Sequence, residues 1–561
     1  MNKLKDSFIE LNSRERAKAV LDKGTFKELI GPFEKFESPH LPLQNIVPQS
    51  DDGIVIAQGL INGKKAVVIS MEGAFQGGGI GEVSGAKFAG ALELALCDNK
   101  NGIKTYPVVI FDTGGVRLQE ANYGLLAISE IQAAVVELRK FVPVVGVIPG
   151  KIGCFGGMSM TAGLFTTLII TPEGRLTLNG PEVIEQEAGI AEFNSKDKRL
   201  IWNTIGGIQR HAAGFTDILA EDDVTSIVDA IKTSLNKKEN TVPRSEQIDI
   251  YLSRLSSIDP SKAITPLEMR ELWKKENFDN KINIKQKPYI EKVMSRGRTW
   301  FEALTNSDGT REGYAPSVLC ADKIIGDETA RFIAVAPNPN ARFPRARHGE
   351  VGLEEGFTIA KYIREAIKED ETKVTKRPII AIVDVPSQAY GYKEELLGIF
   401  ESCAASVDAY VSARLNGHPV VSLIVGPAIS GAFLAHGYQA NTLIALDDPK
   451  VLIHAMSKES AARVTKRSVH ELEEAAKKVP SIAYDIRSYS TLGSLYNLVE
   501  GINADNPSVN DITKIKSILI AAIKAAKENP YDLSDRLKTK QAAVGRAFSI
   551  KVRERLKEEW N

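Results

Sequence analysis

The apolar runs Val108-Val109-Ile110-Phe111-Asp112 and Ile379-Ile380-Ala381-Ile382-Val383-Asp384 decide the fold of this chain, because each is the centre of the same repeated pattern. A Gly-Glu-Val triplet precedes each run, at 81–83 and at 349–351. A Pro-Val-Val run follows each, at 143–145 and at 419–421, and leads to a glycine after the same interval. The copies lie about 270 residues apart, which indicates a duplicated domain and not a solenoid. Because the copies diverge near glycine-rich turns, we expect one composite site formed from the two halves.

Strands alternate with helices along the first copy. An Asn62-Gly63 turn between two short apolar runs is a strong signal for a β-hairpin. We expect strands at 53–61, 65–71, 107–111, 142–148 and 167–171, with helices at 86–96, 122–140 and 158–165. The second copy restarts with its own hairpin, at 317–325 and 329–336. This alternation predicts an α/β fold with helices packed on the sheet faces.

The composition changes between residues 237 and 288, where Ser, Asn, Asp and Lys replace apolar strand runs. We therefore predict two domains, 1–285 and 286–561. Residues 1–40 are predicted to form a charged helical lead-in. The tail from residue 531 onward is rich in Lys and Glu, and we expect a solvated helix that packs on the partner half.

Composition excludes several classes of protein. The net charge is zero and the pI is about 7.1, so no basic field is available for nucleic acid or an anionic membrane. No run reaches the roughly 18 to 20 apolar residues of a membrane helix. The four cysteines are far apart, which argues against a disulfide framework or a metal knuckle. We expect a cytoplasmic, reduced protein without a signal peptide.

Two glycine turns are candidate anion sites. In GCFGGMS at 153–159, glycines let the backbone turn tightly and leave amides at a helix N-terminus. Such amides can hold an anion or a developing oxyanion. The equivalent segment of the second copy is GPAISGA at 426–432. The alternative for both is a tight strand–helix turn without a ligand.

Two arginine motifs leave alternatives open. Arg117 follows a buried strand and could hold a carboxylate, or it could form a structural ion pair with Glu120 or Glu182. The segment RFPRARH at 342–348 could be a solvated loop, or it could bind phosphates or an acidic partner.

Common catalytic motifs are missing from the sequence. The glycines at 77–85 depart by one position from a dinucleotide fingerprint, and no phosphate-binding P-loop occurs. The seven histidines include no HExxH or H-x-x-x-H pair, and no G-x-S-x-G elbow is present. The chain therefore offers oxyanion donors without an evident nucleophile, which suits chemistry that passes through a thioester enolate.

Longer motifs resemble a known family. Those of the first half resemble the beta subunit of malonate decarboxylase: EGAFQGG at 72–78, GEVSGAK at 81–87, TGGVRLQEAN at 113–122, GCFGGMS at 153–159 and NGPEVIEQEAG at 179–189. Those of the second half resemble its gamma subunit: RFPRARHGEVG at 342–352, DVPSQAYG at 384–391, SGAFLAHGYQ at 430–439 and HAMSKESAAR at 454–463. The matches cover nearly the whole chain, which looks like a beta–gamma fusion.

The resemblance implies a fold and a reaction. The fold would be two tandem crotonase-like carboxyltransferase domains, each a superhelix of ββα repeats, related by a pseudo-two-fold axis. The reaction would be decarboxylation of a malonyl thioester on an acyl carrier protein, giving the acetyl thioester and CO2. An acyl carrier protein subunit and an acyl-carrier transferase subunit would be partners, in a homo-oligomeric assembly. We expect no metal or cofactor bound to this chain, because the substrate rides on a phosphopantetheine-type arm.

The resemblance also assigns site residues. The oxyanion holes would use Gly156 and Gly157 in one half and Ser430, Gly431 and Ala432 in the other. The following residues would contact the substrate or its arm: Gly114, Gly115, Val116, Arg117, Gln186, Ser387, Gln388, Tyr390 and His454. Arg342, Arg345 and Arg347 would contact phosphate or the carrier.

Two other functions stay open. A carboxyltransferase that passes the malonyl carboxyl group to a biotinyl protein would need the same fold and the same oxyanion sites. A scaffold that only binds a carrier protein would use both glycine turns structurally. The proton donor to the enolate is also open, with Tyr390, His454 or water as candidates.

Overall fold

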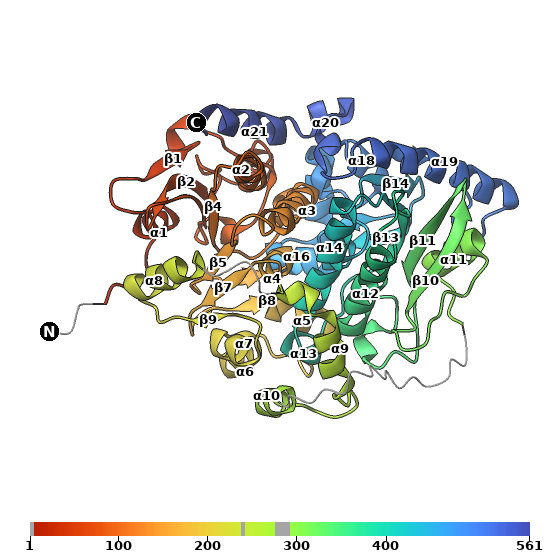
Figure 1. The fold of residues 1–561 in the computed structure, drawn as a ribbon, viewed down its shortest axis with the longest axis horizontal. Coiled ribbons are helices and arrows are strands. Elements are labelled where there is room, and N and C mark those ends of the chain that lie inside the picture. The colour runs from red at the N-terminus through yellow and green to blue at the C-terminus, as the bar shows by residue number, and fades with distance from the viewer. Residues whose placement is uncertain (1–4, 237–241, 275–291, 561) are drawn as a thin grey trace. The chain divides into compact units, whose positions relative to one another are not determined.

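The computed structural model describes residues 5–236, 242–274 and 292–560. Within these, the chain forms two compact units (Figure 1). Unit 1 comprises Met1–Arg244, Glu459–Ile482 and Ala547–Asn561, and unit 2 comprises Ser245–Lys458 and Ala483–Arg546. The predicted boundary near residue 285 lies outside the described residues.

Unit 1 is built on a seven-stranded sheet in the order β1-β2-β3-β4-β5-β7-β9. The strands are β1 (Lys27–Leu29), β2 (Ile54–Ile61), β3 (Lys64–Met71), β4 (Tyr106–Ile110), β5 (Val145–Ile148), β7 (Thr167–Ile170) and β9 (Ile218–Leu219). The first three pair antiparallel and the rest pair parallel. Asn62 and Gly63 have φ angles of 50° and 74°, as a tight hairpin turn of type I′ requires. The predicted hairpin is therefore confirmed.

Unit 2 repeats this arrangement with a second seven-stranded sheet. Its strands are β10 (Val318–Ile325), β11 (Glu328–Val335), β12 (Ile379–Val385), β13 (Val420–Ile429), β14 (Thr442–Leu446), β15 (Ile453–His454) and β16 (Asn497–Val499). The hairpin β10–β11 is antiparallel, and every other pairing is parallel. The predicted duplicated α/β fold is confirmed.

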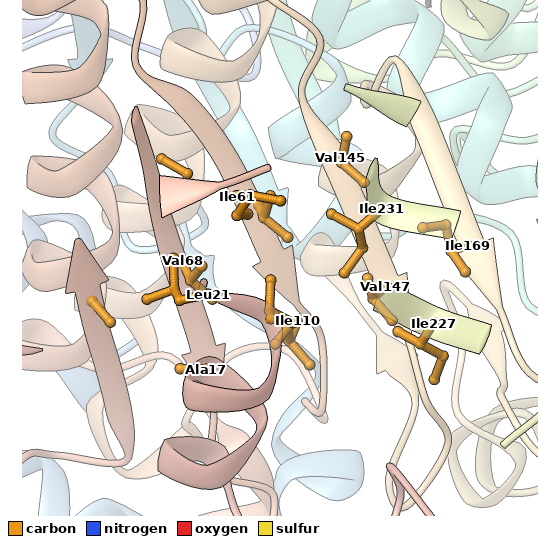
Figure 2. Close-up of a cluster of buried hydrophobic side chains, with 14 of the residues drawn as sticks. Ala17, Leu21, Ile61, Val68, Ile110, Val145, Val147, Ile169, Ile227 and Ile231 are labelled. Atoms are coloured by element: carbon orange, nitrogen blue, oxygen red, sulfur yellow. The ribbon is translucent and has the colours of Figure 1, made fainter. Parts of the chain in front are cut away.

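Buried apolar residues of the sheet and of the helices packed on it form the core of unit 1. Figure 2 shows Val68 and Ile110 on their strands beneath Leu21 of α1 (Ser13–Val20 with its C-cap Leu21). Val147 and Ile169 lie against Ile227 of α8 (Val224–Ser234) in the same way. These strand residues are fully buried, as expected where helices cover a parallel sheet.

Each unit contains two long helices that cross each other at a glycine. In unit 1, α2 (Glu82–Lys100) packs on α3 (Ala121–Leu138), and a Cβ at Gly85 would lie 2.3 Å from the Ala127 Cβ. In unit 2, α12 (Leu353–Glu369) packs on α14 (Ile399–Leu415), and a Cβ at Gly356 would lie 2.4 Å from the Ser402 Oγ. The close crossing is thus a shared feature of the two copies.

Two segments from the C-terminal half of the sequence complete unit 1. The helix α21 (Ala547–Glu559) packs on α2, where its Leu556 covers Gly90 (Figure 1). Arg553 donates to Glu93 and Glu130 at 2.9 and 2.7 Å. The expected packing of the tail on the partner half is confirmed for α21. The lead-in prediction was wrong in part, because residues 5–40 contain one α-helix, α1, followed by β1 and a short 3-10 turn.

The structure corrects the register of the repeat in front of the long helices. Gly81 is the N-cap of α2 and Gly352 is the N-cap of α12, with closely similar backbone angles. Ile80 and Val351, one residue earlier, form equivalent bridges to the next loop. Gly81 therefore corresponds to Gly352 and not to Gly349, so matching the two Gly-Glu-Val triplets was wrong.

Candidate functional site

The site of unit 1 is formed by two loops that follow neighbouring parallel strands. Thr113 N–H donates to the Gly153 carbonyl at 2.8 Å, and Phe155 N–H donates to the Thr113 carbonyl at 3.1 Å. A Cβ at Gly156 would lie 3.5 Å from the Gly115 Cα. The structure thus brings together the predicted groups at 114–116 and 156–157.

Gly156 turns the chain into helix α4 (Gly157–Gly163). Its φ of 59° and ψ of −145° are accessible to glycine and costly for other residues. Its own N–H donates to the Leu178 carbonyl at 3.2 Å, so this amide is already engaged. The next residue, Gly157, is the first of the helix, where an N–H has no intrahelical acceptor. Within unit 1, the Gly157 amide is the candidate oxyanion donor, and Gly156 aims it.

Unit 2 has the same turn with a different residue at its centre. Ile429 pairs with His454 in β15, as Phe155 pairs with Thr177 in β8 (Leu176–Thr177). Ser430 follows with a φ of 60°, and the helix α15 (Ser430–Ala435) begins there. An L-residue in this conformation is strained, and such strain is concentrated at functional sites. The amides of Gly431 and Ala432 lie in the first turn of α15.

The second loop is also equivalent in the two units. In unit 1, Ile80 N–H donates to the Gly115 carbonyl at 2.8 Å, and Arg117 N–H donates to the Ile80 carbonyl at 2.9 Å. In unit 2, Val351 N–H donates to the Ser387 carbonyl at 3.0 Å, and Ala389 N–H donates to the Val351 carbonyl at 3.1 Å. Gly115 therefore corresponds to Ser387, and Arg117 corresponds to Ala389.

Arg117 is an internal residue of unit 1. Its side chain is 1% exposed, and Nη1 donates to Asp52 Oδ1 at 2.6 Å and to Glu120 Oε2 at 2.8 Å. Burial raises the pKa of Asp52 even beside this guanidinium. The ion-pair alternative thus describes Arg117, with Asp52 as a partner that sequence reasoning missed. The guanidinium holds the loop, and its predicted contact with the substrate or its arm stays a prediction.

A second buried network adjoins the first. His40 Nε2 lies 2.6 Å from Glu82 Oε2, and Glu82 Oε1 accepts from Ser549 N–H at 3.0 Å. Burial opposes protonation of His40, but Glu82, with Glu120 and Asp52, outweighs it and raises the pKa of the imidazole. No sequence signal links these residues, because His40 lies 42 residues before Glu82 and Ser549, on α21, lies 467 residues after it.

Gln186 lies on α5 (Pro181–Ala188), on the partly exposed side of unit 1. Its Oε1 accepts from Arg463 Nη1 at 2.9 Å, and Glu185 accepts from Nη2 at 2.7 Å. Ser460 donates to Glu187 beside them. Gln186 therefore takes part in holding α16 (Lys458–Thr465) on α5, and its predicted contact with the arm stays a prediction.

The remaining predicted residues lie in unit 2. His454 is 1% exposed, stacks on Tyr484 with ring centroids 3.8 Å apart, and has Nδ1 3.0 Å from the Met456 carbonyl. Gln388 is buried beside the half-buried Ser387, and Tyr390 is half-buried two residues further on. Their contacts with substrate stay predictions.

The arginine motif at 342–347 is bonded within unit 2. Arg342 donates to Glu354 Oε1 and to the Leu255 carbonyl, both at 2.8 Å. Arg347 Nε donates to the Ala341 carbonyl at 3.2 Å, and Arg345 is half-buried. Two of the three arginines thus hold their own loop in place, and a phosphate contact stays a prediction.

Other site types are not found in the part of the chain that the structure describes. No group of three or more His, Cys, Asp or Glu residues there could hold a metal ion. Across 5–236, 242–274 and 292–560, no helix is both long and apolar enough to cross a membrane. All four cysteines are free, and only Cys97 is exposed.

The sequence of this chain is similar to those of several known proteins. Residues 346–560 match the family model of the malonate decarboxylase gamma subunit. The chain is 38% identical to the malonyl-S-ACP:biotin-protein carboxyltransferase MADC of Malonomonas rubra, over 50% of this chain and 92% of that protein. The chain belongs to the family of malonate decarboxylase carboxyltransferase subunits. The resemblance seen in the motifs is thereby confirmed.

Two further proteins are similar to parts of this chain. MADD of Malonomonas rubra, a second malonyl-S-ACP:biotin-protein carboxyltransferase, is 34% identical over 38% of this chain and 78% of its own length. A malonate decarboxylase hetero-tetramer from Pseudomonas, solved with malonate, contains a chain that is 51% identical. That chain covers 48% of this one and is itself covered to 97%, with a TM-score of 0.47. A fusion of beta-like and gamma-like parts fits these members of the family.

Proposed function

We propose that the chain decarboxylates a malonyl thioester carried on an acyl carrier protein, giving the acetyl thioester and CO2. The observation that carries the proposal is the repeated turn at Gly156 and Ser430. In each unit a left-handed residue leads from a parallel strand into a short helix, so that the next amides point outward from the helix start. Membership of the family supports a malonyl thioester as the substrate.

The reaction needs stabilisation of negative charge. The bond between the methylene carbon and the carboxylate breaks, CO2 leaves, and the electron pair moves to the thioester oxygen as an enolate. A backbone amide such as that of Gly157 in unit 1, or that of Gly431 in unit 2, would donate to the oxygen of a thioester bound in its own unit, and one such donor is typically worth about 2.7–4 kcal/mol. The enolate carbon then takes a proton, for which Tyr390, His454 or water are candidates.

The leaving carboxylate, by contrast, should not be held by a strong ionic partner. A tight salt bridge would stabilise the ground state more than the transition state, because the charge leaves the carboxylate as CO2 forms. Commitment of Arg117 to Asp52 and Glu120 is consistent with this requirement. Each of the loops at 114–116 and 387–390 would then, within its own unit, contact the neutral part of a carrier arm. An acyl carrier protein and an acyl-carrier transferase would be the partners.

A second candidate function is carboxyl transfer to a biotinyl protein. The names of MADC and MADD in Malonomonas rubra favour it, since both describe a malonyl-S-ACP:biotin-protein carboxyltransferase. The enolate and its donors would be the same in both reactions. The two differ in whether the carboxyl group is released as CO2 or passed to biotin.

The test is production of acetyl thioester and CO2 from malonyl-loaded carrier protein, with malonyl-CoA as a surrogate, in the presence of avidin. Turnover that avidin does not affect supports the decarboxylase. Turnover that requires an added biotinyl protein supports the carboxyltransferase instead. No turnover under either condition, with intact carrier binding, would indicate a scaffold.

Donor-deletion variants make the test specific to the turns. Gly157→Pro and Gly431→Pro each remove one N–H, and proline is tolerated in the first turn of a helix. We expect kcat to fall about 10²–10³-fold in each. Gly214→Ala and Gly501→Ala are matched controls, because both glycines have positive φ and open space around the Cβ position. Equal losses in the controls would refute the role of the turns.

A further inference from the structure

The carboxyl group of Glu355 is buried in unit 2 without an ionic partner. Glu355 is 2% exposed and lies in the first turn of α12. Its Oε1 accepts from Ser317 Oγ at 2.6 Å. Its Oε2 is buried, and no atom of the described residues forms a hydrogen bond with it. A carboxylate oxygen in this position would lack the donors that make a buried charge tolerable.

This carboxyl group and the loop that contains Ser387 and Tyr390 both lie next to Gly352. A Cβ at Gly352 would meet Glu355 Oε2 at 2.6 Å, the Ala346 Cβ at 2.9 Å and the Ala389 Cβ at 3.7 Å. Ala389 is itself tied to Val351 by the loop's backbone hydrogen bond. Glu355 Oε2 and Ala389 of this loop therefore border the same Cβ position at Gly352.

In unit 1, charged side chains occupy the equivalent space. A Cβ at Gly81, the counterpart of Gly352, would meet Glu120 Oε2 at 2.2 Å and Arg117 Nη1 at 3.0 Å. Arg117, the counterpart of Ala389, is paired there with two carboxylates. The loop of unit 1 is thus secured by an ion-pair network. In unit 2 the arginine is replaced by alanine, and a single acid occupies the site.

The surroundings of Glu355 disfavour its charged form. Burial, together with Glu354 and Glu350, raises the pKa of Glu355 to about 8, against the hydrogen bonds from Ser317 and from the backbone N–H of Glu355 itself. From the facing helices, the Cys403 thiol and Glu395 belong to the same electrostatic cluster, because Glu395 and Glu355 both raise the pKa of Cys403. The guanidinium of Arg342 is bonded to the neighbouring Glu354 and not to Glu355.

We infer that Glu355 is a positioning residue for the loop at 387–390: as a neutral acid it holds the loop closed, and its ionisation releases the loop. The functional meaning rests on the proposed function, in which this loop holds the carrier arm. The release itself does not depend on that function. When the loop opens, water reaches the carboxylate and the penalty for its charge disappears.

The sign of the pH dependence follows from this linkage. The closed form has the higher pKa, so the opening equilibrium increases with pH from the ordinary range of a glutamate up to about 8. The increase is about tenfold per pH unit over that range and levels off above it. An uncharged amide at this position would remove the dependence.

Hydrogen exchange of peptides covering 385–391 in the full chain tests the inference, between pH 6 and pH 8.5 and corrected for intrinsic exchange chemistry. We expect the opening ratio to increase up to about 100-fold from pH 6 to pH 8 and then to level off. Glu355→Gln should flatten this profile. Glu350→Gln is the control, a carboxyl-to-amide change at a half-buried neighbour, and should retain the slope but level off at a lower pH, because Glu350 contributes to the raised pKa of Glu355. A flat wild-type profile, or an unchanged slope in Glu355→Gln, would overturn the inference.

Steady-state kinetics distinguish a failure of this inference from a failure of the proposed function. If the arm binds to this loop, KM for malonyl-CoA should increase with pH in the wild type and stay constant in Glu355→Gln, with kcat at pH 7 preserved. A loop that opens as expected while KM stays constant in both proteins would support the positioning role and refute the arm contact. The wild-type exchange profile needs no variant, so misfolding of Glu355→Gln would not prevent a decision.

Discussion

Replacing Arg117 with methionine distinguishes the two roles considered for this residue. Methionine keeps most of the side-chain volume but leaves Asp52 and Glu120 buried without their cation. The side chains of both carboxylates are fully buried, and Arg117 is 1% exposed. Removing one partner from such a buried ion pair costs about 3–5 kcal/mol. We therefore expect unit 1 of Arg117→Met to lose about that much stability at pH 8.

Restoring neutrality should recover much of this loss. In Arg117→Met with Asp52→Asn and Glu120→Gln, the amide oxygens can still accept from Ser84 N–H and Ser38 Oγ, as the carboxylates do now. We expect the triple variant to recover at least about 2 kcal/mol. The single variant should also be less destabilised at pH 5, because orphaned buried carboxylates have raised pKa values and take up protons as the pH falls.

The measurement is hydrogen exchange of α2 peptides in a urea series, since a chain with two units need not unfold in one step. Steady-state kinetics with malonyl-CoA are recorded in parallel. Unchanged exchange in Arg117→Met together with an increased KM would refute the structural role, and would mean that Arg117 binds substrate after all.

Three further changes test other parts of the structure. Gly156→Ala should reduce kcat about 10²–10³-fold through misdirection of the Gly157 amide and cost about 1–3 kcal/mol of stability; full activity would show that the turn geometry is dispensable. Ser430→Gly should increase the stability of unit 2 by up to about 1 kcal/mol, measured by urea unfolding, because it relieves a left-handed φ; a decrease would mean that Ser430 is not strained. Leu556→Ala should destabilise unit 1 by about 2–5 kcal/mol, whereas Val544→Ala, at an 83% exposed position, should change stability by less than about 0.5 kcal/mol; similar effects would contradict the packing of α21 on α2.

Local signals made the fold predictable. The turn at Asn62-Gly63 needs only its own backbone preferences, and the run at 379–383 is apolar throughout, as is typical of a fully buried parallel strand. The residue-by-residue correspondence between the two copies was harder to predict. Between Phe343 and Val351 the second copy is longer than the first between Phe75 and Ile80, so a chance Gly-Glu-Val match masked the insertion.

The site was less predictable because its decisive contacts are distant in sequence. The partner of Arg117, Asp52, lies 65 residues earlier, and only the sheet brings them together. The Gly156 amide is engaged by Leu178, which follows a two-residue strand too short to give an apolar signal. Charge and turn motifs therefore located the loops, but could not show which groups the fold had already used.

The dependence of unit 1 on α21 has a consequence for biosynthesis. Arg553 follows its partner Glu93 by 460 residues, so α2 leaves the ribosome long before the helix that covers it. At typical synthesis rates of about 5–20 residues per second, that interval is on the order of 20 to 90 seconds. During this time the surface around Gly90 is open to chaperones or to other nascent chains. The N-terminal unit is therefore finished only after α21 has been synthesised, and stop codons introduced shortly before residue 547 should yield a protein that chaperones retain.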